Sequence, residues 1–143
     1  GCRSKFERPS VDHLLSSLDD SSCRGRDAVE LLWSLGQMSG RGPSPLSTRS
    51  SAFTKLLEAV EDFVREGHMD VQCLCRIMLA VAYLRAGHDG LEALQVRCAD
   101  RYAGLTHEAD AWQLANGAWA LAKSGVRELA AMRGVSAEAV QKI

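Results

Sequence analysis

Cysteine and histidine are the side chains best suited to nucleophilic chemistry or metal binding, and we considered the spacing of the cysteines first. Five cysteines, Cys2, Cys23, Cys73, Cys75 and Cys98, form an odd set without a C-x-x-C pair, which indicates neither a disulfide framework nor a zinc ribbon. Cys73 and Cys75 would point about 200° apart on a helix, so they cannot chelate one ion together there. We therefore predict small free thiols in a reducing compartment, such as the cytosol or an organelle matrix.

The four histidines, His13, His68, His88 and His107, are isolated in the sequence. Each is predicted to be a surface or helix-end residue rather than a ligand or a catalytic base. The sequence also lacks a glycine-rich phosphate loop, an H-E-x-x-H pair and a G-x-S-x-G elbow. We therefore predict no catalytic residue, no metal site, no cofactor and no small-molecule substrate. An enzyme is accordingly a weaker interpretation than a binding protein.

Composition and charge narrow the class of protein. Hydrophobic residues make up 46% of the 143 residues and charged residues 24%, as in ordinary globular domains. The longest apolar run, residues 77–84, lies between two arginines and is shorter than the ~20 residues that span a bilayer, so no membrane insertion is predicted. The net charge of -1 provides no overall positive field, so any contact with RNA must be local.

Apolar residues recur at i, i+3, i+4 and i+7 along almost the whole chain, which predicts an all-α fold. The expected helices are 11–18, 27–38, 52–65, 71–86, 91–101 and 108–124, followed by two short helices over 126–132 and 136–143. A glycine- and proline-rich loop, residues 40–50, separates the second helix from the third.

Two glycines that follow predicted helices define a repeat. Gly87 and Gly125 are 38 residues apart, and the segment AVAYLRAG before Gly87 aligns with AWALAKSG before Gly125. Placing Trp33 on Val81 and Trp119 adds a third copy at an offset of 48 residues, and the loop 40–50 accounts for the longer spacing.

The repeat predicts an α-solenoid of about three stacked helical hairpins, because such helix pairs bury their apolar faces only against one another. The predicted single domain spans residues 1–143, with an N-terminal arm and short helix at 1–26. Repeat 1 covers 27–66 and contains the loop, repeat 2 covers 70–103 and repeat 3 covers 107–143.

The sixth helix is apolar nearly all round, so we predict that it packs on two sides. Trp33, Val81 and Trp119 are expected in matching interior positions, with Trp112 on the same face as Trp119. Stacking of bases on the tryptophans is the alternative interpretation. Gly117 is expected to make room for a neighbouring backbone.

A thin polar stripe remains on the sixth helix and is the candidate binding face. It consists of Gln113, Asn116, Ala120 and Lys123. The repeat offsets relate these positions to Cys75, Met78, Ala82 and Arg85 in the middle repeat, and to Asp27, Glu30, Ser34 and Gln37 in the first. Variation at equivalent positions is typical of recognition surfaces, and simple exposure to solvent would produce it as well.

The segment LANGAWALAKSG, residues 114–125, resembles the L-A-N-x-x-W-A-L-A-x-x-G core of octotricopeptide repeats, which are 38-residue helical hairpins. RIMLAVAYLRAG, residues 76–87, keeps the pattern without its tryptophan and asparagine, and ELLWSLGQMS, residues 30–39, keeps Trp33 without the final glycine. The proline-rich octapeptide of the family is not evident. Octotricopeptide and heptatricopeptide proteins are helical-repeat RNA-binding factors of mitochondria and chloroplasts, so the resemblance implies a role in an organellar ribonucleoprotein.

Under the hypothesis that this resemblance implies, the chain is a mitochondrial ribosome component of the matrix, with the plastid stroma as the alternative location. Its partners would be RNA, ribosomal RNA in particular, and neighbouring protein subunits, with four side chains near the RNA: Arg85, Gln113, Asn116 and Lys123. Three repeats that each discriminate one base by ~1–3 kcal/mol cannot address a unique transcript. The chain is therefore expected to be one subunit of a larger assembly.

The second hypothesis is an α-solenoid adaptor in an organellar complex that binds a protein and no RNA. The acidic helix 52–66 favours this hypothesis.

Overall fold

The computed structural model describes residues 25–39, 51–84, 89–127 and 129–142. Within these ranges every regular element is a helix, which confirms the all-α prediction. The elements are α2 (Gly25–Ser39), α3 (Ser51–Glu66), α4 (Val71–Leu84), α5 (Asp89–Ala103), a short 3-10 helix η3 (Thr106–Glu108), α6 (Ala111–Ser124) and α7 (Leu129–Lys142). The predicted helix 11–18, the loop 40–50 and Gly87 lie outside the described residues.

The end of the chain differs from the prediction of two short helices. α7 is one continuous helix that passes through Gly134 and Ser136. Gly134 lies so close to Thr106 of η3 that an added Cβ would meet the threonine side chain. Packing against η3 and α5 therefore carries the helix through a residue whose intrinsic preference would interrupt it.

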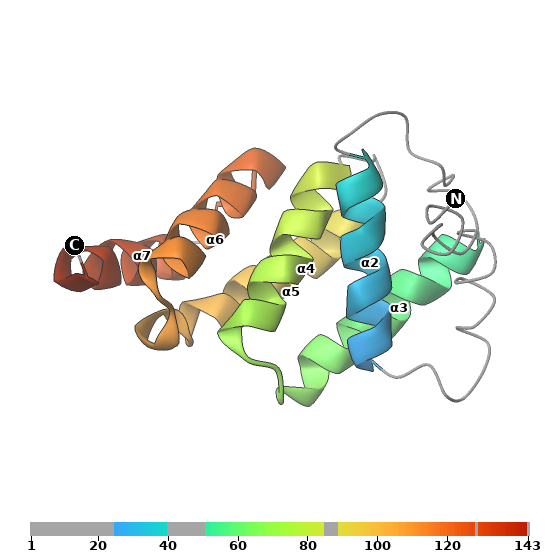
Figure 1. Ribbon diagram of the computed structural model, residues 1–143, viewed down its shortest axis with the longest axis horizontal. Helices are drawn as coiled ribbons and strands as arrows, with labels where there is room; N and C mark the ends of the chain where they lie inside the picture. The colour runs from blue at the N-terminus through green and yellow to red at the C-terminus, as the bar shows by residue number, and fades with distance from the viewer. Residues whose placement is uncertain (1–24, 40–50, 85–88, 128, 143) are drawn as a thin grey trace, which may run out of the picture.

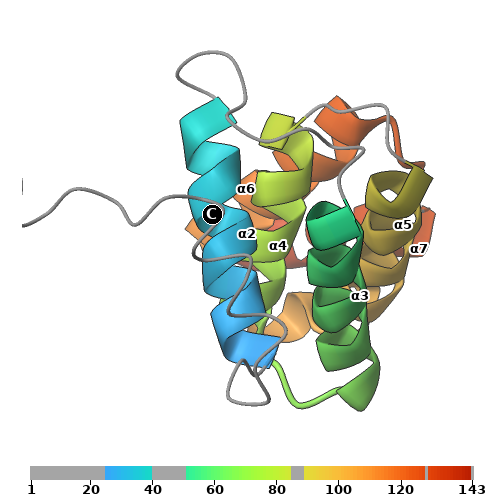
Figure 2. The ribbon, with the colours of Figure 1, turned by 90° about the vertical axis from the view of Figure 1, so that its right-hand side faces the viewer.

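The helices lie in two layers. α4 packs between α2 and α6 in one layer, and α5 packs between α3 and α7 in the other. The pairs α2–α3, α4–α5 and α6–α7 follow one another along the long axis of the molecule (Figure 1). Figure 2 shows α2 and α4 on one side and α3 and α5 on the other. α4 and α5 therefore occupy the centre of the molecule.

Close contacts between successive helices of the α2–α4–α6 layer depend on small residues. A Cβ added at Gly36 of α2 would meet the backbone of Ala80 in α4. At the next interface the Cys75 thiol donates a hydrogen bond to the Gln113 carbonyl oxygen of α6 at 3.5 Å. Cys75 and Gln113 are 38 residues apart, so one pair of positions related by the predicted repeat is in direct contact.

Gln95 of α5 is a completely buried polar residue at the junction of three helices. Its side-chain Nε2 donates hydrogen bonds to the Met78 carbonyl of α4 at 3.0 Å and to the Ser124 hydroxyl of α6 at 2.9 Å. A buried amide is stabilising only when it is paired in this way. Its Oε1 has no partner among the described residues. Within this side chain the Nε2 group alone therefore links α5 to α4 and α6.

Tyr102, seven residues after Gln95 on the same face of α5, makes the second attachment to α6. The ring is fully buried, and its hydroxyl donates to the Gln113 carbonyl at 3.1 Å. Gly117 lies directly against this ring, and an added Cβ would overlap it. The close approach predicted at Gly117 is therefore present, but the neighbour is a tyrosine side chain and not a backbone.

The predicted interior positions of Trp112 and Trp119 are wrong, while Trp33 packs against the core. Val81 is buried and Trp33 is half-buried, whereas Trp112 and Trp119 are 64% and 45% exposed. α6 turns Leu114, Ala120 and Leu121 inward instead, where it packs against α4 and is bonded to Gln95 and Tyr102 of α5. The three aligned positions therefore occupy different environments.

Replacing Gln95 with alanine should lower the free energy of unfolding by about 2–4 kcal/mol. The change leaves a small cavity and removes the partners of Met78 and Ser124 at a buried junction. Urea unfolding followed by circular dichroism measures the loss. Gln141→Ala, an exposed position on α7, is the control and should change stability by less than about 0.5 kcal/mol; equal effects of the two substitutions would disprove the role of Gln95.

Gly117→Ala should destabilise the protein by about 1–2 kcal/mol, although alanine is the better helix former by ~1 kcal/mol. The reason is the collision with the buried Tyr102 ring. The matched control is Gly104→Ala, where the nearest atom to an added Cβ is 3.6 Å away and stability should be unchanged or rise by up to ~1 kcal/mol. A more stable Gly117→Ala protein in urea unfolding would contradict the packing described here.

Candidate nucleic-acid interface

The candidate interface lies on α6, whose start is fixed by a capping box. Asp110 accepts a hydrogen bond from the Gln113 amide at 2.7 Å, and the Gln113 side chain accepts one from the Asp110 amide at 2.9 Å. These reciprocal bonds satisfy amides that would otherwise lack partners at the helix start. At the other end Gly125 adopts a left-handed conformation, with φ of 73°, and ends the helix as predicted.

The capping box changes the interpretation of Gln113. Its side chain is half-buried and bonded at the start of α6, and its carbonyl accepts bonds from Tyr102 and Cys75. This residue therefore serves the packing of α6, and the binding role predicted for its side chain is not supported by its position.

The predicted polar stripe as a whole is not a surface. Ala120 is buried in α6, and the positions aligned with the stripe in α4, Cys75, Met78 and Ala82, are buried as well. The prediction fails in the middle repeat because α4 has helices on both sides, and in α6 it holds only for Asn116 and Lys123. The aligned positions in α2 are exposed or half-buried. Arg85 lies outside the described residues.

The exposed face of α6 contains two tryptophans and two of the predicted site residues. We call it the tryptophan face, and it consists of Trp112, Asn116, Trp119 and Lys123. Steps of four, three and four residues keep these side chains on one side of a helix. Trp112, Trp119 and Lys123 are exposed and Asn116 is half-buried, with its side-chain amide donating to the Trp112 carbonyl at 2.8 Å.

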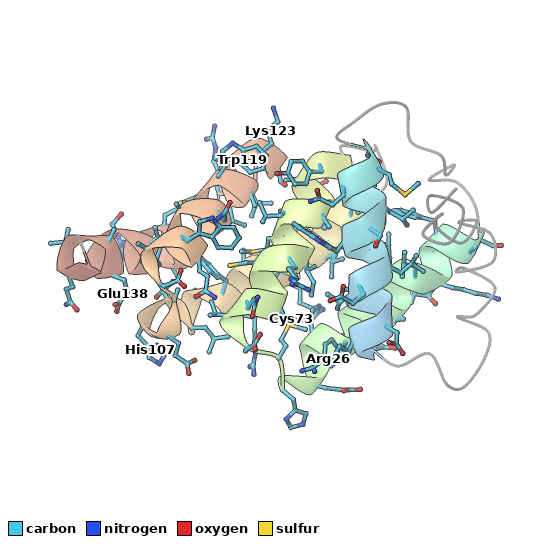
Figure 3. The ribbon with its side chains drawn as sticks, viewed as in Figure 1. Arg26, Cys73, His107, Trp119, Lys123 and Glu138 are labelled. Carbon is cyan, nitrogen blue, oxygen red and sulfur yellow. The ribbon has the colours of Figure 1, made fainter. Side chains whose placement is uncertain are left out.

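The side chains at the end of the tryptophan face lie next to α4. The rings of Trp119 and Tyr83 are 5.5 Å apart, centre to centre, and inclined by 48°, within the range of favourable aromatic pairs. Figure 3 shows Lys123 pointing away from the body of the protein beside Trp119. An aromatic ring and a positively charged side chain are therefore close together on the solvent-exposed surface.

Charge is distributed unevenly over the two layers. Neither α4 nor α6 contains an aspartate or glutamate, while Arg76 and Lys123 lie on them. In the other layer, α3 contains four acidic residues, Glu58, Glu61, Asp62 and Glu66, and Glu61 forms ion pairs with Arg65 and with Arg97 of α5. The tryptophan face is therefore free of acidic side chains from its own helix and from α4, although the whole chain has a net charge of -1.

A polar crevice of about 290 Å³ lies between the first turns of α2 and α4. Its lining consists of Arg26, Val29, Glu30, Asp70, Gln72, Cys73 and Arg76. Its charged groups are largely engaged, since Arg76 pairs with Glu30 at 2.6 Å and Asp70 accepts a bond from the Cys73 amide at 2.9 Å. The Arg76–Glu30 pair joins α4 to α2, and the Asp70 carboxylate bonds the first turn of α4 itself.

The described thiols are poor nucleophiles. Burial raises the pKa of Cys73 to about 11 and that of Cys75 to about 12, and burial also raises the pKa of Cys98. These cysteines therefore stay protonated near neutral pH, and the reactive thiolate form is scarce.

Among residues 25–39, 51–84, 89–127 and 129–142 no three metal-binding side chains come together. No helix in these ranges is long and apolar enough to cross a bilayer.

No protein-family model, curated protein or solved structure matches the chain.

Alkaline pH should destabilise the protein through its buried thiols. Above pH ~9 the thiols of the unfolded chain ionise, whereas Cys75 in the folded chain stays neutral until about pH 12. Its contribution to stability is thus complete below pH ~9 and falls by up to about 1.4 kcal/mol per pH unit above it. Urea unfolding at pH 7.5 and 10.5 should show a smaller loss for Cys75→Ala than for the unaltered protein; identical losses would contradict this origin.

Proposed function

We propose that the chain is a non-catalytic helical-repeat subunit of an organellar ribonucleoprotein, namely a mitochondrial ribosome component that contacts ribosomal RNA and neighbouring proteins. The observation that carries the proposal is the tryptophan face, an exposed aromatic and basic surface on a layered helical protein. The resemblance of residues 114–125 to octotricopeptide repeats supports an organellar setting, the mitochondrial matrix in the first place and the plastid stroma as the alternative.

The α-solenoid part of the proposal is supported by the order of the helix pairs. Each of α4 and α5 packs between the preceding and following helix of its own layer. Contacts between consecutive pairs are the basis of repeat arrays, in which each unit completes the core of its neighbour. The Gly36–Ala80 and Cys75–Gln113 contacts are two successive interfaces of this kind.

Contact with RNA is supported by the local chemistry of α6 and not by the total charge. Lys123 supplies a cation for a phosphate, and the exposed tryptophans supply ring surface for bases. The absence of acidic residues within α4 and α6 limits local repulsion of the phosphate backbone to the Asp110 carboxylate at the start of α6. One described cation on this face supplies only weak attraction, so we expect affinity to come from several subunits that hold one RNA.

A protein adaptor is the second candidate, and exposed apolar area favours it. Trp112 and Trp119 lie beside the exposed alanines Ala115 and Ala122 on α6. Large exposed apolar side chains on one helix are typical of protein interfaces as well as RNA interfaces. The adaptor hypothesis predicts a partner helix on α6 and no nucleotide near Lys123.

Affinity purification of the tagged full chain from a mitochondrial extract tests the proposal. We expect ribosomal RNA and ribosomal proteins to co-purify, with ultraviolet-induced nucleotide adducts at or near Lys123. Lys123→Gln should reduce recovery of the adducts, because it removes a phosphate contact. The control is Lys55→Gln, at an exposed lysine of the acidic helix α3. Protein partners without RNA would support the adaptor instead, and adducts indifferent to Lys123 would contradict the phosphate contact proposed for this residue.

A further inference from the structure

The tryptophan face combines three features that bear on the kind of RNA it fits. Trp112 and Trp119 are large apolar residues that are 64% and 45% exposed. They are separated by seven residues, which places them about 10.5 Å apart along the helix axis. Lys123 follows one turn after Trp119 on the same side.

From this spacing we infer that the tryptophan face binds unpaired, single-stranded RNA by stacking one base on each of Trp112 and Trp119, with Lys123 at an adjacent phosphate. The inference rests on the proposed function and specifies the RNA that the face takes. Base stacking on exposed aromatic rings is the general means by which proteins hold single strands without reading a sequence.

Stacking on both tryptophans excludes duplex RNA as the ligand. Bases in a duplex stack on one another every ~3.4 Å and offer only their edges to a protein. Two tryptophans whose positions are about 10.5 Å apart along the helix axis can each take a base only from a strand whose own stacking is broken. A loop, a bulge or an unpaired end of a larger RNA meets this requirement.

The surroundings of Trp119 favour a base over a protein side chain as the occupant. Tyr83 lies against the Trp119 ring at 5.5 Å between centroids and restricts its orientation. Ring surface remains exposed, and the nearest described charge on α6 is the cation of Lys123. A ligand that is flat, aromatic and attached to an anion complements this arrangement, and a nucleotide is all three.

The test measures binding of the full chain to a labelled, unstructured oligouridine and to a duplex RNA of equal length by fluorescence anisotropy. The unaltered protein should bind the single strand more tightly. Trp112→Ala and Trp119→Ala should each weaken single-strand binding at least about fivefold, while Trp112→Tyr and Trp119→Tyr should retain most of it. Val140→Ala, at an apolar residue of α7 that is 82% exposed, is the control and should have no effect.

The outcomes separate this inference from the proposed function. Equal binding of both RNAs, unaffected by either alanine variant but weakened by Lys123→Gln, would overturn stacking and leave a ribonucleoprotein role based on phosphate contacts. If the alanine variants bind RNA normally but lose a protein from the purified assembly, the face is a protein interface. Absence of binding to either RNA would also overturn the inference, and co-purification of ribosomal RNA would then decide the proposed function separately. Urea unfolding of each variant shows whether a loss of binding reflects a loss of folding.

Discussion

The arrangement of this protein depends on two buried hydrogen-bonding side chains of α5. Gln95 is bonded to Met78 in α4 and to Ser124, the last residue of α6, while Tyr102 is bonded to Gln113 in the first turn of α6. α6 is thus attached to α5 near both of its ends. Because these attachments lie on one side of α6, they act together with the packing of α6 against α4 to leave the tryptophan face outside.

The sequence predicted the helices well and the orientation of α6 poorly. Periodic apolar residues located each described helix from α2 to α6 to within a few residues, and Gly125 marked the end of α6 because a left-handed turn favours glycine. α6 is apolar on nearly every side, however, so periodicity could not show which side faces the core. Two tryptophans there suggested an interior position, since large aromatic residues are usually well buried.

The features that decided the orientation had weak signals in the sequence. Gln95 shares the apolar stripe of α5 with Leu91 and Tyr102, but the sequence could not show which groups of α4 and α6 its amide would meet. Gly117 did indicate a close approach, but the sequence could not identify Tyr102 as the neighbour. Of the four predicted binding residues, Asn116 and Lys123 lie on the exposed face, Gln113 is committed to the capping box, and Arg85 lies outside the described residues. Sequence analysis therefore missed which side of α6 is buried, because contacts with other helices determine it.

Fluorescence of single-tryptophan variants tests this orientation most directly. Replacing the other two tryptophans with phenylalanine leaves Trp112 or Trp119 as the sole emitter in the folded full chain. If α5 holds α6 as described, both should emit at the wavelength of water-exposed indole and be quenched efficiently by acrylamide, Trp112 more than Trp119. Blue-shifted emission with strong protection from acrylamide would mean that the tryptophans face the core, and it would contradict the account.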